Sequence, residues 1–198
     1  MSARDRWLAQ GLEALAEEGA PGVTIDKLSA RVGLSKGSFY HHFAGMPGFT
    51  AALMAHFEAE HTTRFIEAVE AESTASPRAK LESLLAMVLR EQPLAGAPDV
   101  EVALRAWAQQ DPVVRAAQQR VDRIRINYLR DLWLGLSGDA GEASRMGQLL
   151  YLMLIGAGHV IPPLPADQLR LLYDLVLRLA PAGPNSARPR PSSRRKHR

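Results

Sequence analysis

Residues 24–43 read TIDKLSARVGLSKGSFYHHF, and they carry the clearest structural signal in the chain. The stretch divides into two short helical segments around Gly33. Thr24 and Ser35 are placed to cap them, because a hydroxyl there accepts a hydrogen bond from an unpaired backbone N–H of the first turn. Gly33 stands where the chain must turn sharply, a place that favours positive φ. The pattern predicts a helix-turn-helix, whose second helix enters the major groove of DNA.

The second helical segment has a composition suited to a nucleic-acid surface. No carboxylate lies between Asp26 and Glu58, and negative charge there would repel phosphates. Phe39 and Phe43 are four residues apart and are expected to face inward together with Leu28. Val32 and Leu34 complete the apolar positions that the two crossed helices bury. We therefore predict that DNA is contacted by the outward-facing residues of this segment and its caps: Thr24, Ser35, Lys36, Gly37, Ser38, Tyr40, His41 and His42.

The run SKGSFYHHF, followed by a long helix, resembles the TetR family of bacterial transcriptional regulators. The likeness covers residues 1–61 and extends less specifically through WAQQDPVVRAAQQRVDRIRINYLRDLW. The resemblance implies that Tyr40 and His42 contact base methyls or phosphates. It also implies a homodimeric repressor that binds a palindromic double-stranded DNA operator and responds to a small-molecule inducer. One position departs, since the family often has a phosphate-binding lysine where this chain has Met46.

Composition and charge narrow the class of protein. The chain has 198 residues, 46% of them hydrophobic, and no cysteine, so it can form a packed core but neither a disulfide nor a thiolate metal site. No apolar run is suited to a membrane span, and no secretory leader is visible. We therefore expect a cytoplasmic bacterial protein that associates with the nucleoid when it is bound to DNA, and not with a membrane.

The basic charge is concentrated at the C-terminus. Residues 181–198 contain six of the 24 Lys and Arg residues and none of the 21 Asp and Glu residues. The tail is rich in Pro, Ser and Arg, so it is predicted to be disordered. It either adds sequence-independent affinity for DNA or is a solvated extension.

Helical periodicity runs through the rest of the chain, and we predict an all-α fold of about nine helices. Ser2 and Asp5 form a capping box for the first helix. A helix beginning near Pro47 runs to about Glu72, and later helices begin after Ser76, Asp111 and Asp139. The predicted organisation is a TetR-type helix-turn-helix domain of three helices over residues 1–61, then a helical ligand-binding and dimerisation domain over residues 62–180.

The last two predicted helices carry more apolar residues than one small domain can bury. Their extra face indicates a partner, and the simplest partner is a second copy that forms a two-fold four-helix interface. The interface is predicted to include Leu150, Leu154, Leu172 and Val176. A core helix of a single chain is the alternative interpretation.

A ligand pocket is predicted among the helices between residues 76 and 160. Ligand sites are mostly apolar with a few polar groups. Met87, Trp107, Tyr128, Trp133 and Tyr151 are candidate lining residues, although each is also compatible with plain core packing.

Enzyme chemistry finds little support in the sequence. Residues 33–37 match G-x-S-x-G, but that motif needs a preceding strand. His56, Glu60 and His61 do not have zinc-motif spacing and are interpreted as exposed surface residues. We predict that the protein is not an enzyme and that it needs no metal or cofactor. The alternative function is a helical ligand-sensing dimer without productive DNA binding, which Met46 and the near-neutral charge of residues 1–45 favour.

Overall fold

The computed structural model describes residues 2–72, 74–93 and 97–180, and within these ranges every regular element is helical. The all-α prediction is confirmed. None of these helices is long and apolar enough to cross a membrane. The α-helices are α1 Ala3–Glu18, α2 Ile25–Val32, α3 Lys36–His42, α4 Gly45–Glu58, α5 Arg64–Glu70, α6 Pro77–Arg90, α7 Val100–Ala108, α8 Pro112–Ser137, α9 Ala140–His159 and α10 Ala166–Arg178.

Two short elements complete the path of the chain. A 3₁₀ turn, Ala20–Gly22, follows α1, and a π-helical turn, Ala59–Thr63, joins α4 to α5. Because the backbone stays helical through that turn, residues 45–70 form one long helix. Counted in this way, the helices of the described ranges number nine, as predicted. A π turn inside an α-helix often marks a functional position.

The predicted helix starts are confirmed at their capping side chains. Ser2 and Asp5 form the capping box of α1, and Ser76 caps α6. Asp111 and Asp139 cap α8 and α9 through their carboxylates. These side chains satisfy N–H groups that have no partner within their own helix, so the helix boundaries are encoded locally.

One predicted helix begins two residues earlier than the proline that marked it in the sequence. The helix expected to begin near Pro47 begins at Gly45, and no side chain caps it. Gly45 has φ of 72°, and its N–H donates to the carbonyl of Phe43. A glycine tolerates this left-handed conformation, which lets the chain pass from α3 into α4 in two residues.

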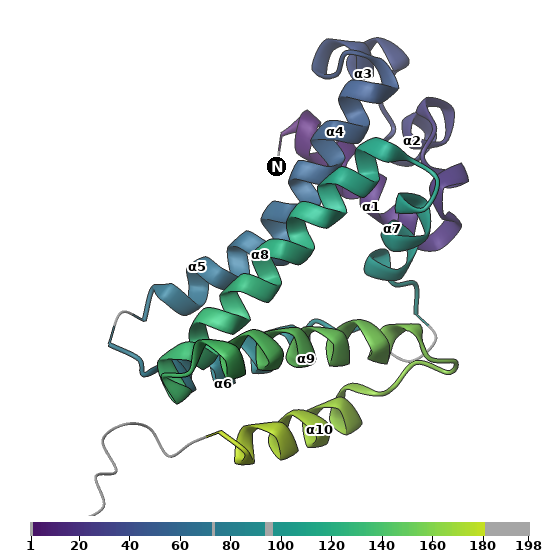
Figure 1. The fold of residues 1–198 in the computed structure, drawn as a ribbon. Helices are drawn as coiled ribbons and strands as arrows, with labels where there is room; N and C mark the ends of the chain where they lie inside the picture. Colours follow the sequence, from purple (N-terminus) through teal and green to yellow (C-terminus); the bar gives the residue numbers. More distant parts are fainter. Residues whose placement is uncertain (1, 73, 94–96, 181–198) are drawn as a thin grey trace, which may run out of the picture.

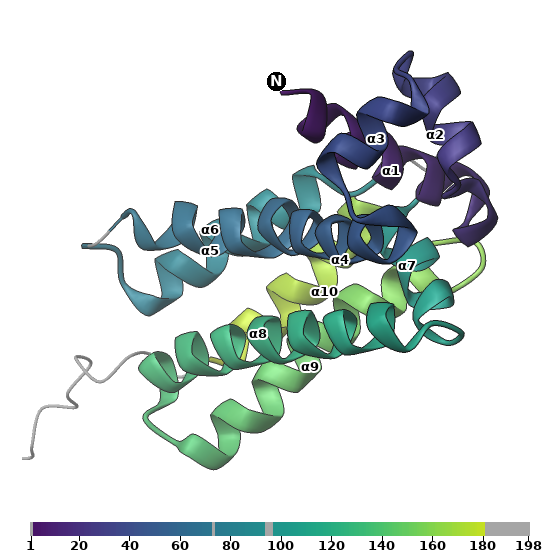
Figure 2. The ribbon, with the colours of Figure 1, turned by 90° about the horizontal axis from the view of Figure 1, so that it is seen from above.

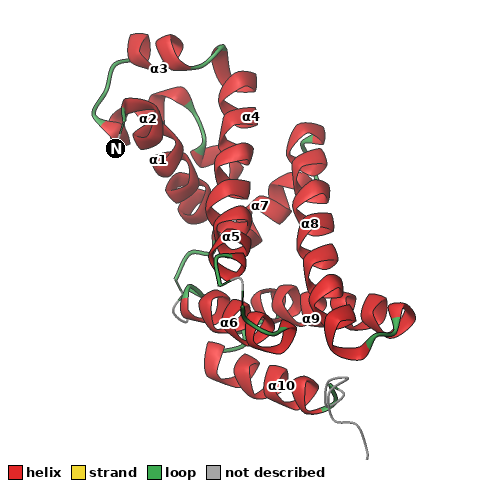
Figure 3. Ribbon diagram, turned by 90° about the vertical axis from the view of Figure 1, so that its left-hand side faces the viewer, coloured by secondary structure: helices red, strands yellow, loops and turns green. Residues whose placement is uncertain are grey.

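The helices form an elongated molecule with two ends (Figure 1). The helix-turn-helix lies at one end of the long α4–α5 helix, and α9 and α10 lie at the other. Helix α8 runs alongside α4–α5, as the view from above also shows (Figure 2). Figure 3 shows α3 and α10 at opposite extremes of the molecule.

Each end of the molecule has its own hydrophobic core. The first core contains Trp7, Leu28, Phe39 and Phe49, and it continues into α7 and the first half of α8 through Leu104 and Val121. The second core joins α5, α6, α10 and the remainder of α8 and α9 around the fully buried Trp133. Helices α7 and α8 thus connect the helix-turn-helix to the C-terminal half. The boundary at residue 61 stays a prediction, because it falls inside the continuous helix.

Candidate functional site

Helix α3 is held so that one side is buried and the other faces solvent. Thr24 Oγ1 accepts from the N–H of Lys27 at 3.4 Å, and Ser35 Oγ accepts from that of Ser38 at 3.3 Å. Gly33 has φ of 69° and ψ of 28°, the left-handed conformation predicted for the turn. Phe39 is fully buried, with its ring centroid 5.3 Å from that of Trp7. Packing of this aromatic side fixes the orientation of α3.

The opposite side of α3 presents the predicted DNA-contacting residues. Tyr40 is 60% exposed, although its neighbour Phe39 is inaccessible. Lys36, Gly37 and His41 are also exposed. Ser38 and His42 are half-buried, and Thr24 and Ser35 are exposed at the helix starts. The structure therefore brings all eight predicted residues to this end of the molecule, with Tyr40 the largest outward side chain of α3.

The basic side chains of α2 and α3 are paired with carboxylates. Lys36 pairs with Asp26, which raises the pKa of the lysine through a hydrogen bond and opposite charge. Lys27 and Arg31 both reach Glu18, each at 2.6 Å. The sequence of α3 contains no carboxylate, but the fold places Asp26 of α2 beside Lys36, the first residue of α3. Phosphates would have to replace these exposed ion pairs, each of which is worth little in water.

Arg4 is a cationic group near α3 that the sequence interpretation missed. Its guanidinium carbon lies 5.7 Å from the ring centroid of Phe43, at the end of α3. Arg4 is exposed and makes no ion pair with any residue that the structure describes. Its sequence signal is weak, because an arginine in the first turn of an amphipathic helix is ordinary. Arg4 belongs to this surface only because the fold brings the end of α3 against the start of α1.

A cavity of about 160 Å³ lies between the long α4–α5 helix and helices α6 to α10. Its lining is mostly aliphatic and aromatic, and it includes Phe65, Leu84, Leu129 and Leu154. His61 and Thr62 line it from the π turn, and Arg125 lines it from α8. The site therefore touches the helix that carries the helix-turn-helix.

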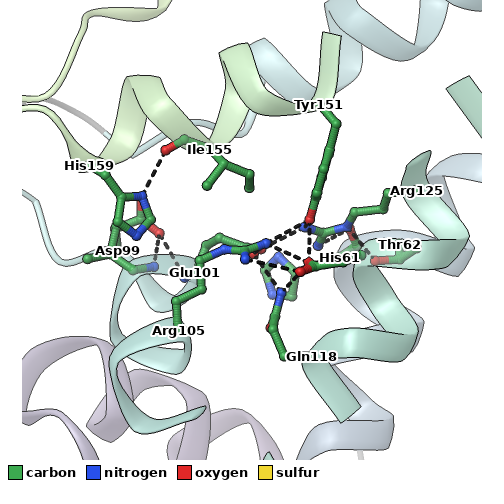
Figure 4. A network of polar contacts seen from close by, with 12 residues as sticks. His61, Thr62, Asp99, Glu101, Arg105, Gln118, Arg125, Tyr151, Ile155 and His159 are labelled. Atoms are coloured by element: carbon green, nitrogen blue, oxygen red, sulfur yellow. Dashed lines mark hydrogen bonds and ion pairs between the residues drawn. The ribbon is translucent and has the colours of Figure 1, made fainter. Parts of the chain in front are cut away.

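A polar network forms one wall of this cavity (Figure 4). Arg125 donates from Nε to Thr62 Oγ1 at 2.9 Å, from Nη1 to Glu101 Oε2 at 2.8 Å and from Nη2 to the carbonyl of His61 at 3.1 Å. Arg105 donates to Tyr151 Oη at 2.7 Å. The network ties the π turn to α7, α8 and α9.

Charges in the network compensate one another. Burial disfavours ionisation of Glu101, but Arg125 and Arg105 outweigh it and hold the pKa of Glu101 below its usual value. Burial also opposes the charge of Asp122, yet its hydrogen bonds from Arg105 and Tyr151 lower the pKa of that carboxyl. Two arginines and two carboxylates thus stay ionised, and their charges cancel.

His61 differs from its predicted place on the surface. It is half-buried, its ring is stacked on Phe57 with centroids 4.9 Å apart and planes inclined by 22°, and it lines the cavity. Burial first, and then the positive charge of Arg125, lowers the pKa of His61. The imidazole is therefore neutral at neutral pH. The prediction of an exposed residue was wrong because α4 continues along α8 and covers this face.

Residues 8–53 match the family model described as bacterial regulatory proteins, tetR family. Residues 8–53 thus form a TetR-type DNA-binding region. Solved structures similar to the chain are NemR from Escherichia coli in its reduced form, a TetR-family transcriptional regulator from Streptomyces coelicolor and a TetR transcription regulator from Haloarcula marismortui. No curated protein matches the chain.

These solved structures share the whole TetR-like fold with the chain at low sequence identity. NemR has a TM-score of 0.75 at 22% identity, covering 92% of this chain and 98% of its own. The Streptomyces regulator has a TM-score of 0.72 at 18% identity, with coverages of 89% and 94%. For the Haloarcula regulator the score is 0.69 at 18% identity, and the coverages are 91% and 97%.

The TetR-type fold brings together only part of the predicted pocket. Tyr128 and Tyr151 line the cavity. Met87, Trp107 and Trp133 do not. Trp133 is inaccessible, and its indole N–H donates to Glu142 Oε1 at 2.9 Å, so it is a core residue. Trp107 packs on the first core and Met87 on the second.

The structure likewise places only some of the predicted dimer residues at the surface. Leu150 and Val176 are 1% and 8% exposed within their own chain, so they pack in the second core and are not free to contact a partner. Leu154 is half-buried and lines the cavity. Leu172 is exposed. Sequence periodicity found the surplus of apolar residues but did not separate the outward-facing residues from the buried ones.

The outward apolar residues of α9 and α10 form two stripes. On α9 they are Leu149 and Leu152, and on α10 they are Leu171, Leu172, Leu175 and Leu179. Leu152, Leu171 and Leu179 are each more than 60% exposed. The predicted basic tail, residues 181–198, lies outside the described residues.

Proposed function

We propose that the chain is a ligand-responsive transcriptional regulator, a repressor that binds a palindromic operator as a homodimer. The observation that carries this proposal is the TetR-type helix-turn-helix, with Tyr40 and His41 exposed on α3 and Phe39 locked into the core behind them. This arrangement supports insertion of α3 into a major groove. The site of action is then bacterial DNA in the cytoplasm, and the role is not enzymatic.

Dimerisation is proposed through the stripes on α9 and α10. Large exposed apolar patches mark interaction surfaces, and two stripes on neighbouring helices suit an isologous four-helix contact. Two copies of α3 would then have to lie about 34–36 Å apart to meet successive major grooves.

We propose that the regulator responds to a ligand that binds in the cavity beside the π turn. A ligand among α6 to α9 presses on His61 and Thr62, so it can displace the helix that carries the DNA-binding domain. It regulates only by its different affinity for the two shapes. The chain has no cysteine, so regulation through a thiol is not available to it.

DNA binding is tested by gel shift with an operator selected from a random DNA pool, beside random DNA at several salt concentrations. Tyr40→Ala should weaken operator binding by about 1–3 kcal/mol with unchanged helicity. Arg4→Ala should weaken binding to both DNAs and reduce the salt slope, because a phosphate contact releases counterions. Arg145→Ala on α9 is the control and should change neither. Unchanged affinity in the first two variants would remove this face from the DNA interface.

The dimer is tested with Leu152→Glu and Leu175→Glu. Both side chains are exposed in the single chain, so the fold should survive while sedimentation shows a monomer. Val113→Glu, at an exposed apolar residue of α8, is the matched control and should remain dimeric. Variants that stay dimeric would refute the proposed interface.

A second candidate function is a ligand-sensing dimer without productive DNA binding. The ion pairs of Lys27, Arg31 and Lys36 favour it, because they reduce the positive charge offered to phosphates. Salt-dependent binding of random DNA would exclude this alternative, and absence of any gel shift would support it.

A further inference from the structure

The size of the cavity beside the π turn suits a small ligand. Its volume of about 160 Å³ is below the roughly 300–1,000 Å³ of sites for drug-sized ligands. An apolar cavity of roughly 150 Å³ is known to hold one benzene ring. Phe65, Leu84 and Leu129 supply apolar walls on three helices. The space therefore suits a single aromatic ring.

The charges on the wall disfavour an anionic ligand. Arg125 is the arginine that lines the cavity, and its charge is balanced by Glu101 at 2.8 Å. Glu91 is paired with Arg64 at 2.6 Å, and Asp99 uses Oδ1 to cap α7. A carboxylate placed here would lose its hydration and meet no uncompensated positive charge. A neutral ligand avoids that cost.

The hydrogen-bonding groups on the wall mainly accept. Tyr128 donates its proton to Glu70, Tyr151 to Asp122 and Tyr173 to the carbonyl of Leu150. Tyr128 and Tyr173 have therefore given their only proton to the protein and offer a ligand only lone pairs. Tyr151 also accepts from Arg105 and Arg125, so its hydroxyl is fully used within the protein. The wall is thus matched to a ligand that donates.

His61 is the polar group best placed to receive that donor. Its stacking on Phe57 fixes the ring, and no hydrogen bond from the ring occurs within the described part of the chain. Burial beside Arg125 keeps the imidazole neutral, so one ring nitrogen carries a free lone pair.

We propose that the cavity binds a small, neutral, single-ring aromatic compound of the phenol class, whose hydroxyl donates to the imidazole of His61. This inference rests on the proposed function in taking the cavity as the effector site. It adds the chemical class of the effector. The ligand is held at the π turn, where its presence acts directly on the helix that leads to the DNA-binding domain.

Calorimetric titration of the full chain at about pH 7.5 tests the class with three probes. Phenol is neutral there because its pKa is about 10, as for tyrosine. Phenol should bind, and anisole, which has the ring but no donor, should bind about tenfold more weakly, as expected for the loss of one hydrogen bond. Benzoate should not bind. Benzoate binding as tightly as phenol, or no phenol binding at millimolar concentration, would overturn the proposal.

Two matched pairs of variants test the position. His61→Phe keeps the stacked ring and should reduce phenol affinity to that for anisole, whereas His56→Phe, on the same long helix and outside the cavity lining, should not. Leu154→Trp should fill the cavity and abolish binding, whereas Leu134→Trp, outside the lining, should preserve it. Phenol affinity that is unchanged in both His61→Phe and Leu154→Trp would place the ligand elsewhere and refute the site.

The ligand class and the role as a DNA-binding regulator can be refuted independently of each other. Phenol binding without any DNA binding would support the ligand class and refute the regulator. Salt-dependent operator binding without phenol binding would support the regulator and refute the ligand class.

Discussion

Arg125→Met tests whether the buried network holds the π turn against α7 and α8. Methionine retains much of the apolar stem but removes the donations to Thr62, Glu101 and the carbonyl of His61. Thr62 is 2% exposed, so its hydroxyl would lose a partner that water cannot easily replace. The side chains of Arg125 and Glu101 are only 13% and 22% exposed.

The expected loss of stability follows from this burial. Removing one member of a buried ion pair costs about 3–5 kcal/mol, because the remaining polar groups stay desolvated. Arg120→Met is the control, since this arginine also lies on α8 and pairs with Glu58 of α4 at 2.6 Å. Its side chain is 47% exposed, so its loss should cost at most about 1 kcal/mol.

Urea unfolding followed by circular dichroism at 222 nm measures both effects, at one fixed protein concentration because the proposed dimer links stability to concentration. The slope with urea should stay unchanged, so that the midpoints report stability. Arg125→Lys should lie between wild type and Arg125→Met, since an ammonium keeps the charge but cannot reach all three acceptors. Equal losses in Arg125→Met and Arg120→Met would refute the argument that burial makes this network important.

Gly147→Ala should lower urea stability by about 1–3 kcal/mol, because a Cβ there would lie 2.8 Å from the backbone nitrogen of Arg130. Since the obstacle is backbone, Arg130→Ala should not rescue it, and rescue would contradict the proposed clash. The lowered pKa of His61 means that the unfolded chain binds a proton at this imidazole more readily than the folded chain does, so stability that is present above pH 6.5 should be lost as the pH falls below it. His61→Phe should flatten this pH dependence when urea midpoints are measured at several pH values. An unchanged pH dependence would exclude His61 as its source. Asp26→Asn should free Lys36, so gel shifts should show severalfold tighter binding of random DNA and a steeper dependence of that binding on salt. Asp131→Asn, which removes a carboxylate paired with Arg130, is the control and should change neither. Equal effects of the two variants would show that the Lys36–Asp26 pair does not limit DNA binding.

Much of the helix-turn-helix was predictable because its signals are local. Thr24 and Ser35 cap helices with their own side chains, and Gly33 takes up the left-handed turn that its missing Cβ permits. Phe39 and Phe43 occupy one side of a short helix by spacing alone. Such features involve residues within four positions of one another, so the sequence displays them directly.

The candidate cavity could be predicted only in part. Tyr128 and Tyr151 are aromatic residues with polar ends, and that chemistry was visible. His61 was interpreted as an exposed surface residue, and nothing in the sequence singled out Glu101 or Arg125. The contacts of Arg125 join residues 24 to 64 positions apart, so the sequence does not display them. Trp133 shows the converse error, since a large polar-edged side chain proved to be plain core.

The all-helical class, the helix-turn-helix, its caps and the surplus of apolar residues at the C-terminal end are all visible in the order of the amino acids. These follow from local hydrogen bonding and from periodicity. Tertiary structure alone decided that Asp26 meets Lys36, that Arg125 holds the π turn, and that Leu152 and Leu175 point outward while Leu150 and Val176 are buried. The physical reason is that the side of a helix that is buried depends on which neighbours pack against it, and those neighbours are brought together only by the complete fold.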